Sequence, residues 1–187
     1  TEELAEWIIK DHGSAGPLSL LDIGTGSGCI AISLKKKIPA ATVAACDISE
    51  EALAVAKENA ASHKTAISFI QLDFLDEREW KKMDQYDIIV SNPPYIPQSE
   101  ARTMNANVVK YEPATALFVP DNNALLFYEA IARFGQAHLK PGAYSYVEIH
   151  ESLGQAAIGL FLQYNYTPLL KKDMQGKDRM IRAVKAG

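Results

Sequence analysis

The chain has few cysteines and few histidines. Its two cysteines, Cys29 and Cys46, form no C-x-x-C pair and stand in apolar stretches, where this residue is mostly a small buried packing group. So little cysteine excludes a disulfide scaffold and favours a reducing compartment, so we expect a cytoplasmic protein. The four histidines lack the paired spacing of metal ligands, and we therefore predict no metal site.

The sequence also lacks a long hydrophobic run and an excess of basic residues. Its most apolar window, residues 18–34, is interrupted by Asp22 and three glycines, so we expect no membrane partner. The chain has 19 Lys and Arg against 23 Asp and Glu, which argues against a surface that neutralises many phosphates of a nucleic acid. Six basic residues near the end are interpreted as a solvated surface: Lys171, Lys172, Lys177, Arg179, Arg182 and Lys185.

What the chain does have is enough apolar sequence for one core. With 187 residues, of which 48% are hydrophobic and 22% charged, it fits a single globular domain over residues 1–187. The chain starts at Thr1 without a methionine and enters a helical pattern at once, through Leu4, Trp7 and Ile8. We therefore expect further residues, and even a whole domain, upstream.

Strand-like and helix-like patterns alternate along the chain. Strands are predicted at 18–23, 42–46, 67–72, 86–91, 143–149, 167–172 and 179–184, and helices at 29–36, 50–61, 124–137 and 153–163. Such a βα repeat predicts an α/β fold with a mostly parallel seven-stranded sheet and helices on both faces. No helix separates the last two strands, so we expect a C-terminal antiparallel hairpin.

One long connection, from residue 92 to about residue 121, is predicted to be unstructured. Connections of this length in a compact domain are usually lids or binding loops. The connection follows a strand, and ligands of open α/β sheets bind beyond the carboxyl ends of the strands. We therefore expect the functional site at that edge.

A glycine-rich turn follows the first predicted strand. Its residues are Asp22, Gly24, Thr25, Gly26, Ser27 and Gly28, with glycine at every second position. Such a turn lets a ligand approach the backbone and presents N–H groups at a helix N-terminus. The alternative is that the glycines only end a strand. The spacing differs from the G-x-G-x-x-G fingerprint of dinucleotide sites.

Acidic residues at the ends of the next two strands suggest a nucleoside ligand. Asp47 ends the second strand about 20 residues after the glycines, where an acid can accept from ribose hydroxyls. Its alternative role is to start the helix that follows.

Asp22 would repel a pyrophosphate but suit an ammonium group, so we predict S-adenosylmethionine as the cofactor. Asp73 and Phe74 are expected beside its adenine, although Phe74 could instead be a core aromatic.

The fourth strand ends in Asn92-Pro93-Pro94-Tyr95. Prolines remove backbone donors, so this stretch offers acceptors without competing N–H groups. A planar carboxamide nitrogen is a poor nucleophile and must be held. We predict that the Asn92 side-chain oxygen and the Pro93 carbonyl accept its hydrogens while Tyr95 packs on the flat substrate group. Asn-Pro can also be a simple turn.

With these motifs, the sequence resembles the protein-(glutamine-N5) methyltransferases of the release-factor class, the family called PrmC or HemK. The matching segments are "LLDIGTGSGCIAISL", Asp47, "LDF" at 72–74, "VSNPPYI", "YEPATAL" at 111–117 and "GKDRMIRAV" at 176–184. They occur in the same order and spacing over essentially the whole chain. The resemblance implies a Rossmann-like class I fold that depends on S-adenosylmethionine.

The resemblance also implies a substrate, the glutamine of the Gly-Gly-Gln motif in peptide chain release factors. Separately, we expect the protein to be a monomer. The turn and Asp47 would bind cofactor, Asn92 would touch cofactor and substrate, and Pro93, Pro94 and Tyr95 would hold the glutamine. Family members carry a small helical domain upstream. The sequence departs from the family at Phe74, where many members have tryptophan, and around His150.

Two other functions stay open at this point. An adenine-N6 methyltransferase acting on RNA or DNA solves the same chemical problem, because an exocyclic adenine amine is also planar, but it must hold nucleic acid and usually flips out the base. A catalytically silent cofactor-binding module would keep the glycine turn without needing the acceptors at residues 92–95.

Overall fold

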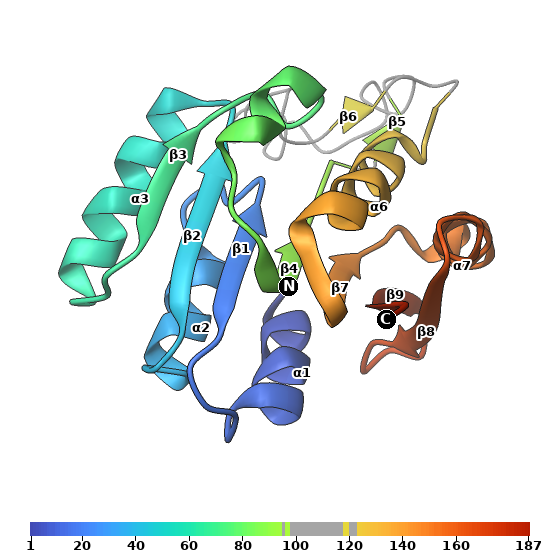
Figure 1. Cartoon of the computed structure of the whole chain (residues 1–187), viewed down its shortest axis with the longest axis horizontal. Helices are drawn as coiled ribbons and strands as arrows, with labels where there is room; N and C mark the ends of the chain where they lie inside the picture. The colour runs from blue at the N-terminus through green and yellow to red at the C-terminus, as the bar shows by residue number, and fades with distance from the viewer. Residues whose placement is uncertain (95, 98–117, 120–122) are drawn as a thin grey trace.

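A computed structural model describes residues 1–94, 96–97, 118–119 and 123–187 of the chain. Tyr95 and most of the predicted connection, with the "YEPATAL" segment, lie outside the described residues. Seven strands form one sheet in the order β3-β2-β1-β4-β7-β9-β8 (Figure 1).

The strands of this sheet are β1 (Ser19–Ile23), β2 (Thr42–Asp47), β3 (Ser68–Gln71), β4 (Tyr86–Ser91), β7 (Leu139–Glu148), β8 (Tyr166–Lys172) and β9 (Asp178–Lys185). The pairs from β3 to β7 are parallel, whereas β9 is antiparallel to both β7 and β8. The predicted mixed sheet with its C-terminal hairpin is therefore confirmed.

Helices cover both faces of the sheet, as predicted. They are α1 (Glu2–His12), α2 (Cys29–Lys37), α3 (Glu50–Ser62), α6 (Leu126–His138) and α7 (Gly154–Gln163), with short 3₁₀ turns η1 (Glu77–Lys82) and η3 (Glu151–Leu153). Helices α1 and α2 share one hydrophobic core with the sheet, and α6 and α7 share the core on the other face. Strand side chains alternate between the two cores, so the sheet is buried on both sides, as parallel sheets usually are.

Three local predictions differ from the structure. Strand β7 begins at Leu139, whereas the sequence predicted a start at residue 143. The prediction was late because the strand contains Pro141 and Gly142, two residue types that disfavour strands. The connection predicted to be unstructured contains a two-residue parallel pair, β5 (Ile96–Pro97) with β6 (Phe118–Val119). Cys46 is buried as expected, but Cys29 is exposed, because it is the first residue of α2 and follows the open glycine turn.

Parallel strands bring their carboxyl ends to one edge of the sheet. The register pairs Ile23 with Cys46 on one side and with Ser91 on the other, and Ser91 with Val147. The residues that follow these pairs are therefore neighbours at that edge. They are the glycine turn, Asp47, Asn92 and Glu148. The site was predicted there.

Candidate functional site

The glycine turn between β1 and α2 folds back onto β2. The backbone N–H groups of Gly24 and Thr25 donate to the Cys46 carbonyl at 2.9 and 3.0 Å, and the N–H of Gly26 donates to Asp47 Oδ2 at 2.9 Å. The N–H groups of Gly24 and Thr25 are therefore not available to a ligand. Their donors have partners inside the protein, as buried backbone groups nearly always do.

The turn instead offers open space. Gly24 and Gly26 have φ angles of 68° and 55°, and a Cβ at either position would meet no atom within 4 Å. Gly28 differs, because its Cβ would lie 3.2 Å from both Ala56 Cβ and Ile32 Cδ1. Gly24 and Gly26 thus leave room for a ligand against the backbone, whereas Gly28 allows α2 and α3 to pack closely. Ser27 is exposed beside them, with its hydroxyl 3.2 Å from Cys29 Sγ.

Asp22 is a buried carboxyl group beneath this turn. It is 1% exposed, and its Oδ2 accepts from Thr25 Oγ1 at 2.6 Å and from the Ala31 N–H at 3.2 Å. Its other oxygen, Oδ1, is buried and has no hydrogen-bond partner among the described residues. Burial raises the pKa of Asp22 to about 7, against the two hydrogen bonds, which lower it. Asp22 therefore holds the turn to α2 and keeps one acceptor unused.

Asp47 is half-buried at the end of β2. Its Oδ2 accepts from Gly26 N–H, and its Oδ1 accepts from Ser49 N–H at 3.0 Å. The cap of α3 is Ser49, whose hydroxyl accepts from Ala52 N–H at 3.1 Å. Asp47 is thus not the N-cap of the helix, and its carboxylate faces the glycine turn, as a ribose-binding acid in this fold should.

Asp73 and Phe74 follow β3 and differ in exposure. Asp73 is exposed and accepts from the Leu75 N–H at 2.9 Å. Phe74 is only 6% exposed, and its ring packs against Trp80 and Phe134 with centroids 5.7 and 5.2 Å apart. The structure therefore places Phe74 in the core, which was the alternative left open for it. Asp73 lies where a ligand could reach it.

Two apolar residues that the sequence reasoning missed are exposed at this edge. Ile48, directly after Asp47, is 52% exposed, and Leu75, two residues after Asp73, is 38% exposed. Exposed apolar side chains next to two strand-end acids suit a flat, partly apolar ligand group. For Ile48, its position directly after a strand-end acid was the sequence signal that could have identified it.

Asn92 follows β4 at the centre of the sheet. Its Nδ2 donates to Thr1 Oγ1 at 2.8 Å, and its Oδ1 is buried without a hydrogen-bond partner in the described part of the chain. Pro93 is buried and Pro94 half-buried. Three of the four residues predicted to hold the substrate amide thus follow β4, the strand next to β1, and Tyr95 lies outside the described residues.

Glu148 and Thr1, neither of which the sequence reasoning assigned to the site, adjoin Asn92. Glu148 ends β7 and is 6% exposed, and its Oε2 accepts from Thr1 Oγ1 at 2.9 Å. Thr1 precedes α1, and the end of the chain marked N lies beside β4 in Figure 1. Residues 147 positions apart carry no local pattern that would reveal this contact.

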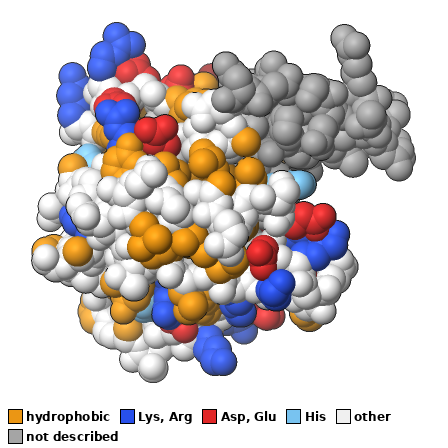
Figure 2. Space-filling view, turned by 90° about the vertical axis from the view of Figure 1, so that its right-hand side faces the viewer, with side chains coloured by type: hydrophobic (Ala, Val, Ile, Leu, Met, Phe, Trp, Pro, Cys, Tyr) orange, Lys and Arg blue, Asp and Glu red, His pale blue; other side chains and the backbone are white. Residues whose placement is uncertain are grey.

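The C-terminal basic residues are largely neutralised. Four of the six make ion pairs of 2.6 to 3.2 Å: Lys172 with Asp178, Lys177 with Glu151, Arg179 with Asp173, and Arg182 with Asp11. Lys171 lies over the ring of Trp7, and Lys185 donates to two backbone carbonyls. Figure 2 shows basic and acidic side chains next to one another on this side of the molecule. Such a surface is poorly suited to neutralising a phosphate backbone.

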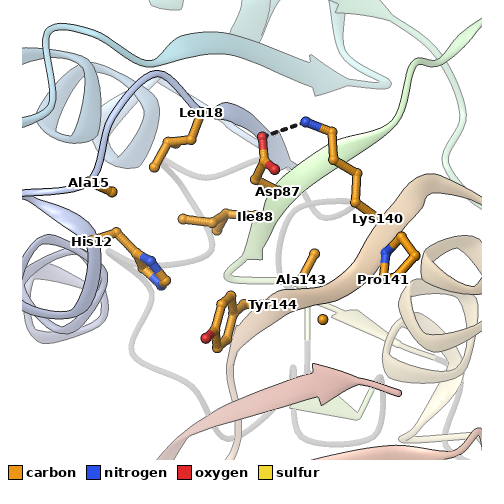
Figure 3. Close-up of a pocket in the computed structure, with 10 residues that line it drawn as sticks. His12, Ala15, Leu18, Asp87, Ile88, Lys140, Pro141, Ala143 and Tyr144 are labelled. Carbon is orange, nitrogen blue, oxygen red and sulfur yellow. Dashed lines mark hydrogen bonds and ion pairs between the residues drawn. The ribbon is translucent and has the colours of Figure 1, made fainter. Parts of the chain in front are cut away.

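A hollow of about 240 Å³ lies at the opposite edge, near the amino ends of β4 and β7 (Figure 3). Its charged residues, Asp87 and Lys140, form an ion pair of 2.7 Å, and His12 and Tyr144 line it. This hollow is separate from the glycine turn and from Asn92, so it plays no part in the site.

Within the residues that the structure describes, no three His, Cys, Asp or Glu side chains gather as a metal site would need. No helix among them has both the length and the apolar character for crossing a bilayer.

Comparisons with known proteins agree with the geometry. The chain is 46% identical over 186 residues to a release factor glutamine methyltransferase of Flavobacterium psychrophilum, covering 97% of this chain and 65% of that protein. It is 46% identical over 184 residues to the protein of that name from Bacteroides thetaiotaomicron, covering 98% and 65%. The chain thus spans about two thirds of the length of these relatives, and the resemblance inferred from the motifs is confirmed.

Solved structures share the fold. A release factor-specific protein-(glutamine-N5) methyltransferase from Alicyclobacillus acidocaldarius superposes with a TM-score of 0.62 at 21% identity, covering 100% of this chain and 91% of that one. A methyltransferase from Pyrococcus furiosus gives a TM-score of 0.68 at 18% identity, with 100% and 84% covered. The family model described as the methyltransferase small domain matches residues 8–117. The chain belongs to the methyltransferase small-domain family.

Proposed function

We propose that this chain transfers a methyl group from S-adenosylmethionine to the side-chain nitrogen of the glutamine in the Gly-Gly-Gln motif of peptide chain release factors. The observation that carries the proposal is the Asn92 carboxamide, whose nitrogen is held by Thr1 and whose buried oxygen has no hydrogen-bond partner among the described residues. The names of the relatives support the choice of substrate.

The residues at the edge of the sheet fit the cofactor. Gly24 and Gly26 leave open space for it, and Asp47 offers acceptor oxygens toward a ribose. Ile48 and Leu75 offer apolar surface to an adenine, and Asp73 could accept from its amino group. Phe74 would support this surface from the core rather than stack on it. When bound, S-adenosylmethionine supplies an electrophilic methyl group.

The chain's own residues then prepare the nucleophile. Oδ1 of Asn92 accepts one hydrogen of the substrate carboxamide, and the Pro93 carbonyl accepts the other. These fixed acceptors hold the nitrogen and stabilise the positive charge that develops on it, without reorganisation during the reaction. Pro94 and Tyr95 are proposed to complete the pocket for the glutamine. No strong general base is needed, because the charged amide product is acidic enough to lose its proton to water.

The direct test is mass spectrometry of the Gly-Gly-Gln peptide of a release factor after incubation with the complete gene product and S-adenosylmethionine. We expect a mass increase of one methyl group on the glutamine. An unmodified glutamine, with a correctly folded and cofactor-binding protein, would contradict the proposal.

The alternative of an adenine-N6 methyltransferase is less well supported, because the basic cluster is largely ion-paired. We also propose that the protein is a monomeric cytoplasmic enzyme with a protein substrate and without a direct nucleic-acid or membrane partner. Residues 1–187 are proposed to form one domain, and a helical domain upstream stays a prediction. Labelled cofactor offered together with total RNA and a release factor separates the two functions, since label in RNA alone would favour the alternative.

Replacing Asp47 with asparagine should weaken cofactor binding. A hydrogen bond to a charged acceptor contributes about 1.5–3 kcal/mol, so we expect the Kd for S-adenosylmethionine to rise roughly 10- to 100-fold. Isothermal titration calorimetry measures this change. Asp84→Asn is the matched control, because Asp84 is exposed and lies before β4 at the opposite edge. Equal affinities for Asp47→Asn and Asp84→Asn would remove Asp47 from the cofactor site.

A further inference from the structure

The two ends of the Asn92 carboxamide have different surroundings. Its Nδ2 donates to Thr1 Oγ1 at 2.8 Å, while its Oδ1 has no partner among the described residues. A carboxamide can rotate by 180° and exchange these ends, which would present a donor in place of an acceptor. In the proposed chemistry, the substrate amide donates its N–H groups. Asn92 must therefore present its oxygen to the substrate and direct its nitrogen elsewhere.

The hydroxyl of Thr1 selects that orientation. Thr1 Oγ1 donates its single hydrogen to Glu148 Oε2 at 2.9 Å. The hydroxyl hydrogen of Thr1 is therefore committed to Glu148, and the lone pairs of the hydroxyl oxygen face Asn92. If the Asn92 carboxamide were reversed, its oxygen would face those lone pairs without a hydrogen between them. The orientation with Nδ2 toward Thr1 is therefore favoured.

The fold brings these three residues together from distant parts of the chain. Asn92 and Glu148 are the next residues after Ser91 and Val147, which pair between β4 and β7. Thr1 stands before α1, which is anchored in the core by the fully buried Leu4 and Ile8. Glu148 lies at the N-terminus of α1, where the helix dipole favours a negative charge. This position suits Glu148 to accept the hydroxyl hydrogen of Thr1.

We propose that Thr1 and Glu148 are positioning residues that fix the Asn92 carboxamide with its oxygen available to the substrate. This inference rests on the proposed function, because the orientation of Asn92 matters only if its oxygen accepts from the substrate amide. The competing explanation is that Thr1 and Glu148 only attach α1 to the sheet. That explanation predicts effects on folding and none specific to Asn92.

The test replaces the hydroxyl of Thr1 while keeping its shape. Thr1→Val in the complete gene product should lower kcat for methylation of a release factor about tenfold, the effect of one lost hydrogen bond. The affinity for S-adenosylmethionine should change less than about twofold. Thr1→Ser restores the hydroxyl and should return kcat to within about threefold of wild type. The Thr1 side chain makes no capping hydrogen bond to α1, so Thr1→Val removes none.

Two further variants separate positioning from stability. Thr65→Val is the matched control, because Thr65 Oγ1 donates to the Ala60 carbonyl at 3.2 Å, far from Asn92 along the sheet, and kcat should be unchanged. Glu148→Gln keeps the size of the side chain but can offer Thr1 a donor, so the carboxamide of Asn92 loses its fixed orientation and kcat should fall about threefold to tenfold.

The coupling between Thr1 and Asn92 is measured by a double-mutant cycle. If Thr1 acts through Asn92, adding Thr1→Val to Asn92→Ala should lower kcat no further. Independent, multiplied losses would overturn the proposal. A second measurement needs no activity: in nuclear magnetic resonance spectra, the Asn92 side-chain N–H₂ protons should exchange with water at least about tenfold faster in Thr1→Val.

These outcomes distinguish failure of the inference from failure of the proposed function. A wild-type protein that leaves release factors unmodified contradicts the function, whereas the exchange measurement still reports whether Thr1 holds Asn92. Conversely, an active Thr1→Val variant with unchanged Asn92 exchange overturns the positioning role and leaves the proposed function intact.

Discussion

The Asn92→Ala variant is expected to lose about 99% of its turnover or more, because one preorganised acceptor is removed from the transition state. By analogy with a single oxyanion-hole donor, the loss is roughly 3 kcal/mol, or about a hundredfold or more in kcat. Asn92 holds the substrate nitrogen where positive charge develops, so its contribution is larger in the transition state than in the bound substrate. Single-turnover methylation of a release factor measures the chemical step directly.

The same variant should still bind the cofactor within a few-fold of wild type, since the open turn and Asp47 are unchanged. Gln85→Ala is a matched control, because Gln85 is an exposed residue just before the other end of the same strand, β4, and its carboxamide donates to the Ala137 carbonyl. Its kcat should stay within about twofold of wild type. Turnover of Asn92→Ala close to that of Gln85→Ala would show that the amide does not hold the substrate.

A different result would favour the silent binding module. In that case the wild-type protein would bind S-adenosylmethionine and transfer no methyl group to any release factor. The Asn92 oxygen, which is buried and has no partner among the described residues, argues against this outcome, because leaving an acceptor unsatisfied costs about 1–3 kcal/mol. A module that only bound cofactor would gain stability by replacing it.

The architecture could be predicted from local patterns. The buried strands β1 and β4 read as short apolar runs, and each is followed by residues that break the pattern, the glycine turn and Asn92-Pro93. Because parallel strands place such breaks at one edge, the sequence also predicted where the site lies. The hairpin followed from two strand patterns with no helix between them.

Side-chain environment was less predictable. Phe74 follows a strand-end acid, as a ligand-contacting ring would, but the rings of Trp80 and Phe134 take it into the core. Residue type alone does not distinguish the two positions. The exposed Ile48 and Leu75 were missed for the converse reason, since apolar residues are first assigned to the core.

Long-range contacts were beyond reach of the sequence. Thr1 and Glu148 meet only because α1 packs against the sheet beside β7, and neither residue belongs to a motif that names its partner. The donors of Gly24 and Thr25 illustrate the same limit. Their partner, the Cys46 carbonyl, is set by the pairing of β1 with β2, which no spacing within the glycine turn reveals.

Asp22→Asn is expected to stabilise the free protein while weakening cofactor binding. Burial raises the pKa of Asp22 to about 7 in the folded state, from an ordinary value of 3.8 in the unfolded chain. Between these pH values the folded protein keeps a proton that the unfolded chain has lost, so the free energy of unfolding falls as pH rises. Above about pH 7 the folded state carries a buried charge. An asparagine carries none, so the variant should gain roughly 2–4 kcal/mol at pH 8.

Urea unfolding at several pH values measures this effect. Wild type and Asp22→Asn should be nearly equal in stability at pH 4, and the variant should pull ahead as pH rises to 7, with a constant difference above that. Asp84→Asn, which changes an exposed carboxylate, should follow wild type throughout. A variant less stable than wild type at every pH would mean that Asp22 acts only as an acceptor for Thr25 and Ala31.

Cofactor affinity should change in the opposite direction. Asp22 Oδ1, which has no partner in the described part of the chain, gives the glycine turn a negative charge above about pH 7, and this charge favours a ligand that carries an ammonium group. We expect Asp22→Asn to raise the Kd for S-adenosylmethionine about tenfold at pH 8 and less at pH 6, where wild-type Asp22 is largely protonated. If one substitution both stabilises the protein and weakens ligand binding, the charge of Asp22 serves binding. Burying an ionised carboxylate has no advantage for the fold itself.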